Sequence, residues 1–192
     1  YALASGCVVV AAAGNDNTSV PFYPASYTGV VSVASTRDDD TKSGFSNYGP
    51  TITVSAPGSN IYSTLPGGTY GYLSGTSMAS PLVAGLLGLM RSYHPGMPNT
   101  DLVNCLKSSA VSIDALNSSY SGQLGTGRID AAAAMTCVEA ALTHPPVAEF
   151  SVNNASISAG GSVRFTESST YAPTSWSWQF PGGTPATYSG QI

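Results

Sequence analysis

Ser77 is the residue of this sequence best placed to act as a nucleophile. It lies in the segment Gly75–Gly85, whose Gly-Thr-Ser start is followed by small and apolar residues. Such a run predicts a buried helix that is apolar on every side, with Thr76 and Ser77 at its N-cap or in its first turn. Pro81 fits this helix only within the first turn. Negative charge is favoured at a helix N-terminus, so a serine there suits a reaction that forms an oxyanion.

Asn15 is the second polar residue with a candidate chemical role. It follows Gly14 at the end of the apolar run Cys7–Ala13, which predicts a buried parallel strand. Active sites of parallel sheets lie at the carboxyl ends of the strands. A neutral amide there can donate to an oxyanion without competing for the proton of the nucleophile. Taken alone, a Gly-Asn pair after a strand is more typical of an ordinary turn, but together with the serine motif it favours the oxyanion role.

Both segments resemble those of the subtilisin-like serine proteases. Gly75–Gly85 is similar to the nucleophile segment of that family, and Ala12–Asn15 is similar to the segment whose asparagine donates to the oxyanion. Leu82 departs from the family pattern, which often has a non-catalytic histidine there. The resemblance implies that Ser77 attacks the scissile carbonyl and that Asn15 and the backbone N–H of Ser77 stabilise the oxyanion.

The resemblance also implies a set of substrate-binding residues. Ala12–Gly14 would line the pocket for the side chain before the scissile bond, and Phe22 would narrow it. This stretch is small and uncharged, so an apolar or aromatic preference is expected. The full set of expected substrate-binding residues is Ala12, Ala13, Gly14, Phe22, Gly75 and Thr76.

The base that a serine nucleophile requires is not evident in this sequence. In the subtilisin order the aspartate and histidine precede the serine, whereas His94 and His144 both follow Ser77. We expect both histidines to lie on the surface. The base and its orienting carboxylate are therefore expected upstream of Tyr1, and the chain by itself is expected to be inactive.

Two alternatives compete with this interpretation. An α/β-hydrolase would place its acid and histidine after the serine, which would combine Asp114 or Asp130 with His144. That fold requires Gly-x-Ser-x-Gly, and Ala79 occupies the last position. The non-enzyme alternative is a secreted binding or adhesion protein with a degenerate protease domain, which does not explain why a nucleophile and an oxyanion donor occur together.

Composition excludes several classes of partner. Only 8% of the 192 residues are charged, with six Lys plus Arg and a net charge of −4. So few cations cannot follow a phosphate backbone, so no nucleic acid is expected. The longest apolar run, Val83–Met90, is too short to span a bilayer, so no membrane insertion is expected. A surface rich in Ser, Thr, Asn and Gly suits a secreted protein that acts on protein or peptide substrates.

No cofactor is expected for the chemistry, and no metal-binding residue is identified. Many members of the family carry an acidic residue of a weak cation site where this chain has Thr53. The acidic run Asp38–Asp40 is more typical of a solvated turn, because consecutive side chains diverge. A structural calcium ion is compatible with the resemblance, but the sequence offers no ligands for it.

The expected strands and helices indicate an α/β fold with a parallel sheet. The resemblance implies that residues 1–142 are the C-terminal part of a three-layer, subtilisin-like domain. Cys105 and Cys137 fall on its last two helices and are predicted to form a disulfide, the alternative being two buried free thiols. Cys7 is expected to be a packed thiol or to pair outside this chain. The remaining expected elements are strands over Val30–Ala34 and Ile52–Ala56, a hairpin around Pro66–Gly68, a helix capped by Asn99 or Thr100, and a helix over Ala131–Leu142 capped by Asp130.

Residues 143–146 are predicted to form a linker, after which the composition changes. Val147–Val152 and Trp176–Phe180 alternate apolar and polar residues, as half-buried strands do. The Pro-Val-Ala-x-Phe opening and the Trp-Ser-Trp-x-Phe strand resemble a PKD-type immunoglobulin-like sandwich. Such a fold needs about 100 residues, so residues 147–192 would be its N-terminal part. The resemblance implies a module that binds insoluble protein or polysaccharide.

Overall fold

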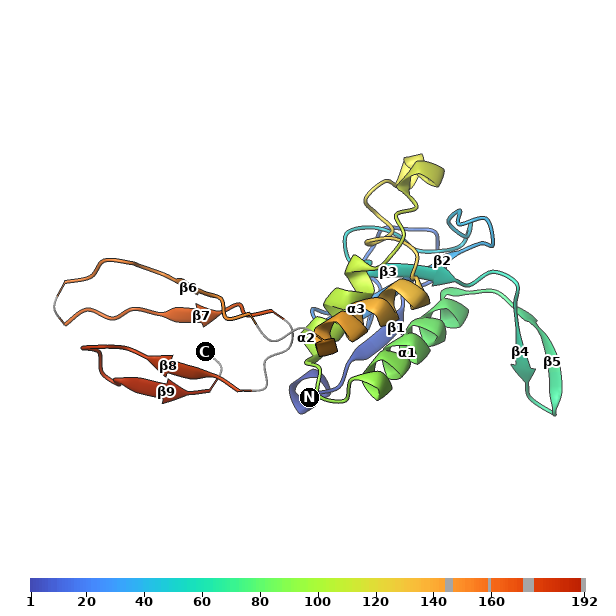
Figure 1. Cartoon of the computed structure of the whole chain (residues 1–192). Helices are drawn as coiled ribbons and strands as arrows, with labels where there is room; N and C mark the ends of the chain where they lie inside the picture. Colours follow the sequence, from blue (N-terminus) through green and yellow to red (C-terminus); the bar gives the residue numbers. More distant parts are fainter. Residues whose placement is uncertain (144–146, 159, 171–174, 191–192) are drawn as a thin grey trace. The chain divides into compact units, whose positions relative to one another are not determined.

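The computed structural model describes residues 1–143, 147–158, 160–170 and 175–190 (Figure 1). The chain divides into two compact units, Tyr1–Val138 and Glu139–Ile192. Residues 144–146 of the predicted linker lie outside the described residues.

A parallel three-stranded sheet forms the centre of the first unit. Its order is β1 (Val9–Ala12), β2 (Val30–Thr36) and β3 (Val54–Pro57). Nearly all of β2 is buried, because a central parallel strand is covered on both faces. β1 is shorter than the predicted run Cys7–Ala13 and only half-buried. Among the described strands it pairs with β2 alone, so the prediction of a buried strand is wrong at this edge.

Helix α1 (Thr76–Tyr93) packs against all three strands of this sheet (Figure 1). Its opposite side leaves Leu82 41% and Leu89 53% exposed. The prediction of a helix buried on every side is therefore wrong, because hydropathy does not determine which faces are covered by neighbours. The buried residues recur every three or four positions and are Thr76, Ala79, Val83, Leu86, Leu87 and Met90.

The start of α1 also differs from expectation. Its N-cap is Gly75, while Thr76 and Ser77 are the first two helical residues, which agrees with their predicted first-turn position. Pro81 is the sixth residue of the helix and lies beyond the first turn, so the prediction for Pro81 is wrong. Because proline has no N–H, the helical hydrogen bond to the carbonyl of Ser77 is absent.

The chain enters α1 from a hairpin of β4 (Ile61–Leu65) and β5 (Thr69–Leu73), as predicted. The turn contains Gly67 and Gly68, with φ of 81° and 73°, a left-handed conformation that glycine adopts without strain. The hairpin therefore delivers the chain directly to the N-terminus of α1.

Two further helices follow, α2 (Asn99–Ser108) and α3 (Ala131–Thr143), and the division between the two units falls within α3, after Val138. The N-cap of α2 is Pro98, so the predicted capping by Asn99 or Thr100 is wrong. The side chain of Asn99 instead donates to the carbonyl of Gly6. Asp130 is confirmed as the cap of α3, because its carboxylate accepts from the N–H of Ala133 at 2.9 Å. The short 3₁₀ turns are η1 (Leu3–Ser5), η2 (Asp114–Leu116) and η3 (Ser118–Tyr120).

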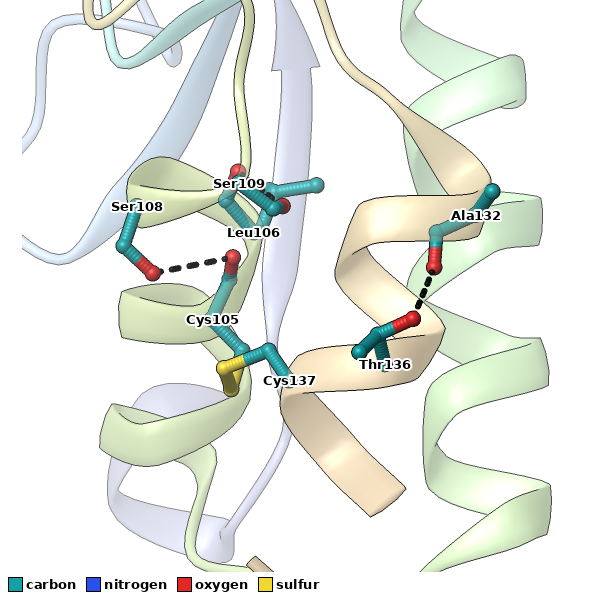
Figure 2. Close-up of a disulfide and its surroundings, with 7 residues drawn as sticks. All are labelled: Cys105, Leu106, Ser108, Ser109, Ala132, Thr136 and Cys137. Atoms are coloured by element: carbon teal, nitrogen blue, oxygen red, sulfur yellow. Dashed lines mark hydrogen bonds between the residues drawn. A yellow bond between two sulfur atoms is a disulfide. The ribbon is translucent and has the colours of Figure 1, made fainter. Parts of the chain in front are cut away.

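A disulfide between Cys105 and Cys137 joins α2 to α3 (Figure 2), with a Cα–Cα distance of 5.7 Å. These are the two cysteines that the sequence places on neighbouring helices. Cys7 is a free, exposed thiol. The prediction that it packs in the core is wrong, because it precedes β1 instead of lying within it.

The second unit contains two antiparallel strand pairs. They are β6 (Phe150–Val152) with β7 (Phe165–Glu167) and β8 (Ser177–Gln179) with β9 (Thr187–Ser189). None of the described residues from 147 onward is buried. Four aromatic rings instead lie against one another with centroids 4.9–6.2 Å apart, and they belong to Phe150, Phe165, Trp178 and Phe180. The immunoglobulin-like sandwich stays a prediction.

Candidate active site

The N-terminus of α1 and the loop after β1 are joined by hydrogen bonds at the carboxyl edge of the sheet. The N–H of Gly14 donates to Oγ1 of Thr76 at 3.2 Å. The backbone N–H and the hydroxyl of Thr76 both donate to Oδ1 of Asn15, at 2.9 and 3.0 Å. Thr76 is fully buried, so it positions Asn15 and presents no side chain to a substrate.

These hydrogen bonds determine which end of the Asn15 amide is available. Because Oδ1 accepts two hydrogen bonds from Thr76, the donor group Nδ2 remains for a ligand. The backbone N–H of Ser77 is a second donor, since the first N–H groups of a helix have no intrahelical acceptor. Asn15 and Ser77 are both exposed.

Gly75 keeps open a space that these two donors share. A β-carbon at Gly75 would lie 3.6 Å from the backbone nitrogen of Ser77 and 3.7 Å from Nδ2 of Asn15. The two nitrogens therefore lie at similar distances from the same point, as does Sδ of Met78 at 3.7 Å. Two donors that converge beside a serine can stabilise an oxyanion formed by attack of that serine.

The residues predicted to line a substrate pocket divide into two groups. Phe22 is 42% exposed, and its ring lies against Gly14, where a β-carbon would be 3.0 Å from Cγ of Phe22. Ala12 is half-buried on β1. Ala13 is buried in a core cluster that includes Ile52 and Leu124, so its side chain does not line a pocket. The structure therefore brings Gly14 and Phe22 together and removes the side chains of Ala13 and Thr76 from the candidate surface.

Asn47 is a buried residue that no sequence motif indicated, and its side chain contacts the loop that carries Asn15. The only sequence signal was its place in the segment Gly44–Pro50, which follows the strand next to β1 along the sheet. An amide in such a segment is common in turns, so its type alone did not indicate a role.

Lys42 is a buried charged residue that contacts this loop from the neighbouring segment. It is 8% exposed, and its Nζ donates to Oδ1 of Asn17 at 2.8 Å and to the carbonyls of Ser43 and Ser46. The ammonium also lies 4.6 Å from the ring centroid of Tyr120, a cation–π contact. Burial lowers the pKa of Lys42, because desolvation disfavours its charged form.

The described residues provide no base for Ser77. His94 is the C-cap at the far end of α1, an 18-residue helix that spans about 27 Å. His144 lies outside the described residues. Asp114 binds Ser121 and Gly122, and Asp130 caps α3. The described acidic residues of the α/β-hydrolase alternative are thus engaged in local structure.

Two other classes of feature are absent from the part of the chain that the structure describes. Its residues contain no group of three or more His, Cys, Asp or Glu side chains that could hold a metal ion. Within the same ranges, no helix has the length and apolar character needed to cross a membrane.

Comparison with known proteins identifies relatives of the first unit. The chain is 45% identical over 131 residues to "Halolysin-like extracellular serine protease Nep" from Natrialba magadii, a match that covers 68% of this chain and 24% of that protein. It is 58% identical over 92 residues to thermitase from Thermoactinomyces vulgaris, covering 48% of this chain and 33% of thermitase. A solved protease structure from Pseudoalteromonas arctica superposes with a TM-score of 0.64 at 38% identity, covering 70% of this chain and 44% of that one.

In each of the three matches, the chain spans less than half the length of the matched protein. The family model described as "Subtilase family" matches residues 1–144, which include the sheet, the loop of Asn15 and the N-terminus of α1. The chain therefore belongs to the subtilase family.

Proposed function

We propose that this chain is part of a secreted serine endopeptidase that cleaves peptide bonds through an acyl-enzyme on Ser77. The observation that carries the proposal is the convergence of two N–H donors, from Asn15 and from the Ser77 backbone, on the space beside Gly75. Family membership and the printed names of the relatives, which include serine proteases and subtilisins, support the same chemistry.

In the proposed mechanism, Oγ of Ser77 attacks the carbonyl carbon of the scissile bond. The carbonyl oxygen becomes an oxyanion, which accepts hydrogen bonds from Nδ2 of Asn15 and from the N–H of Ser77. A histidine outside this chain takes the proton of the hydroxyl and returns it to the leaving amine, and an aspartate orients that histidine. Water then hydrolyses the acyl-enzyme. The chemistry uses protein groups alone, and this chain by itself is inactive.

The pocket for the residue before the scissile bond lies beside the loop of residues 12–14, where the exposed ring of Phe22 narrows it. Gly14 is itself buried against Phe22 and Asn47, and neither Ala12 nor Phe22 carries a charge. Apolar or aromatic residues are therefore favoured at that substrate position over charged ones, because an unpaired charge is costly to desolvate.

The second unit has a separate proposed role. Residues 147–192 form the N-terminal part of a PKD-type sandwich that binds insoluble protein or polysaccharide. The two antiparallel pairs and the rings of Phe150, Phe165, Trp178 and Phe180, none of them buried, support this proposal. Secretion is supported by the disulfide, which is typical of oxidising compartments.

The test requires a form of the protein as long as its relatives, called here the full-length form. Treatment with a fluorophosphonate probe should label Ser77, and Ser77→Ala should abolish the label. Ser92→Ala is the matched control, because Ser92 is an exposed serine near the C-terminus of the same helix, and it should leave labelling unchanged. Persistent labelling of the Ser77→Ala protein would place the nucleophile elsewhere.

A further inference from the structure

We propose that Asn47 is a positioning residue that holds the oxyanion donor Asn15 in place by hydrogen bonds to the loop that carries Asn15. This inference rests on the proposed function, because it concerns the precision of the same oxyanion site. The side chain of Asn47 hydrogen-bonds to the loop of residues 13–18, and the atoms nearest to the space beside Gly75 belong to other residues, so Asn47 would affect catalysis through this loop.

Asn47 forms a hydrogen bond with each of four residues of this loop. Its Nδ2 donates to the carbonyl of Ala13 at 3.0 Å. Its Oδ1 accepts from the N–H groups of Asp16 and Thr18, at 2.9 and 3.3 Å. Its backbone N–H donates to the carbonyl of Gly14 at 3.0 Å. These contacts lie on both sides of Asn15 along the chain, so they determine the path of the backbone that carries it.

The fit between Asn47 and the loop leaves no room for another side chain. Asn47 is 3% exposed, and a β-carbon at Gly14 would lie 2.3 Å from its Nδ2. Gly14 also has a φ of 103°, a backbone angle that residues other than glycine rarely adopt. The close approach of Asn47 is therefore possible only because position 14 is glycine.

Asn47 is itself anchored to the sheet. The hydroxyl of Ser46 donates to the carbonyl of Asn47 and accepts from the N–H of Ser35 on β2. Lys42 donates to the carbonyl of Ser46 and to the side chain of Asn17. The central strand, the segment of Asn47 and the loop of Asn15 thus form one continuous hydrogen-bonded assembly.

This arrangement matters for catalysis because oxyanion donors act by preorganisation. A displacement of about 1 Å in a positioned group can cost about 10²-fold in rate. Without the Asn47 side chain, the N–H groups of Asp16 and Thr18 lose their acceptor and the loop can shift. Asn15 would still be present, but its Nδ2 would be held less accurately.

The experiment is a double-mutant cycle in the full-length form. Asn15→Ala, Asn47→Ala and the double variant are compared by kcat and KM, with active sites counted by fluorophosphonate titration so that unfolded protein does not contribute. We expect Asn15→Ala to lower kcat by about 10²–10³, the loss seen for such a donor in a subtilisin. Asn47→Ala should lower kcat about tenfold with KM within about twofold, and in the Asn15→Ala background this loss should fall to within about twofold.

The control is Ser55→Ala. Ser55 is also buried, and its hydroxyl donates to the carbonyl of Leu124 at 2.8 Å, outside the assembly that holds the Asn15 loop. It should lower stability while leaving kcat per active site within about twofold. If Asn47→Ala yields too little folded protein, Asn47→Ser replaces it in the same cycle.

Two results would overturn the inference alone: an unchanged kcat for the Asn47 variant, or the same tenfold loss with and without Asn15. An unchanged kcat for Asn15→Ala would be a different failure. It would remove Asn15 from the oxyanion site, and with it the oxyanion part of the proposed function.

Discussion

The two units of this chain are built on different principles. The first has a buried interior of apolar side chains, from Val31 on β2 to Val138 on α3, and buried polar groups that are almost all hydrogen-bonded. In the second unit, no described residue is buried, and the aromatic rings contact one another while remaining partly exposed.

This difference in burial indicates which unit can hold catalytic side chains in accurate positions. In the first unit, the side chains of Asn47 and Thr76 are buried, and their polar atoms hydrogen-bond to protein groups of the Asn15 loop. Enclosure makes a broken hydrogen bond costly, by about 1–3 kcal/mol for a buried group left unsatisfied. An exposed aromatic surface has no such constraint, and it suits adaptable binding better than chemistry.

The largest expected difference between the units is the cost of deleting a large side chain. Leu106 on α2 is fully buried, so Leu106→Ala should lower the free energy of unfolding by about 2–5 kcal/mol. Phe165→Ala in β7 should cost about 1 kcal/mol, because the ring is only half-buried. Denaturant titration with hydrogen exchange, which reports each unit separately, measures both.

The exposed residue Leu116 supplies the control within the first unit, and Leu116→Ala should change stability by less than about 0.5 kcal/mol. If Phe165→Ala lowered the free energy of unfolding as much as Leu106→Ala, the proposed difference between the units would be contradicted, because the aromatic cluster would then be packed as tightly as the core.

The second difference concerns covalent stabilisation. Replacing Cys105 and Cys137 by serine opens a loop with a sequence separation of 32 residues, and this should cost the first unit about 2–4 kcal/mol. The second unit should be unaffected, since residues 147–192 contain no cysteine. Cys7→Ser is the control, because that thiol is free and exposed. Unchanged melting of the first unit after reduction would contradict the expectation.

The smallest expected effect is electrostatic and belongs to the first unit alone. Burial lowers the pKa of Lys42 below its ordinary 10.5, so between these two values the unfolded chain binds more protons than the folded one. Stability should therefore rise with pH across this window. Lys42→Met should remove the rise, while Lys107→Met at an exposed position of α2 should retain it. The measurement is the difference in unfolding free energy between variant and parent as pH is raised towards 10.5.

Local sequence patterns predicted the strand and the helix that position the site. They did not predict which faces of these elements are covered by other parts of the fold. The apolar run before Gly14 indicated the end of a strand, and the segment around Ser77 indicated the start of a helix. Patterns of adjacent residues are enough to indicate where a strand ends and a helix starts. The structure places them at one edge of the sheet. The exposed side of α1, with Leu82 and Leu89, could not be foreseen, since an apolar side chain does not reveal what lies opposite it.

The role of Asn47 was hidden for a related reason. Its hydrogen bonds reach back about thirty positions along the chain, and an asparagine near a glycine is ordinarily a turn residue. The position of Pro81 was mistaken because a general rule for helix interiors was applied to a helix whose tertiary contacts tolerate a missing hydrogen bond.

The disulfide has a mechanical consequence. When tension is applied between the first residue and a point beyond α3, it passes from Cys137 directly to Cys105 through the sulfur atoms (Figure 2). Residues 106–136 are then outside the load path and cannot be extended, which removes about 100 Å of contour length. This shielded stretch includes Gly127 and Ile129, which hydrogen-bond to β3. A pull applied beyond α3 would therefore not draw these residues out of the disulfide-closed loop.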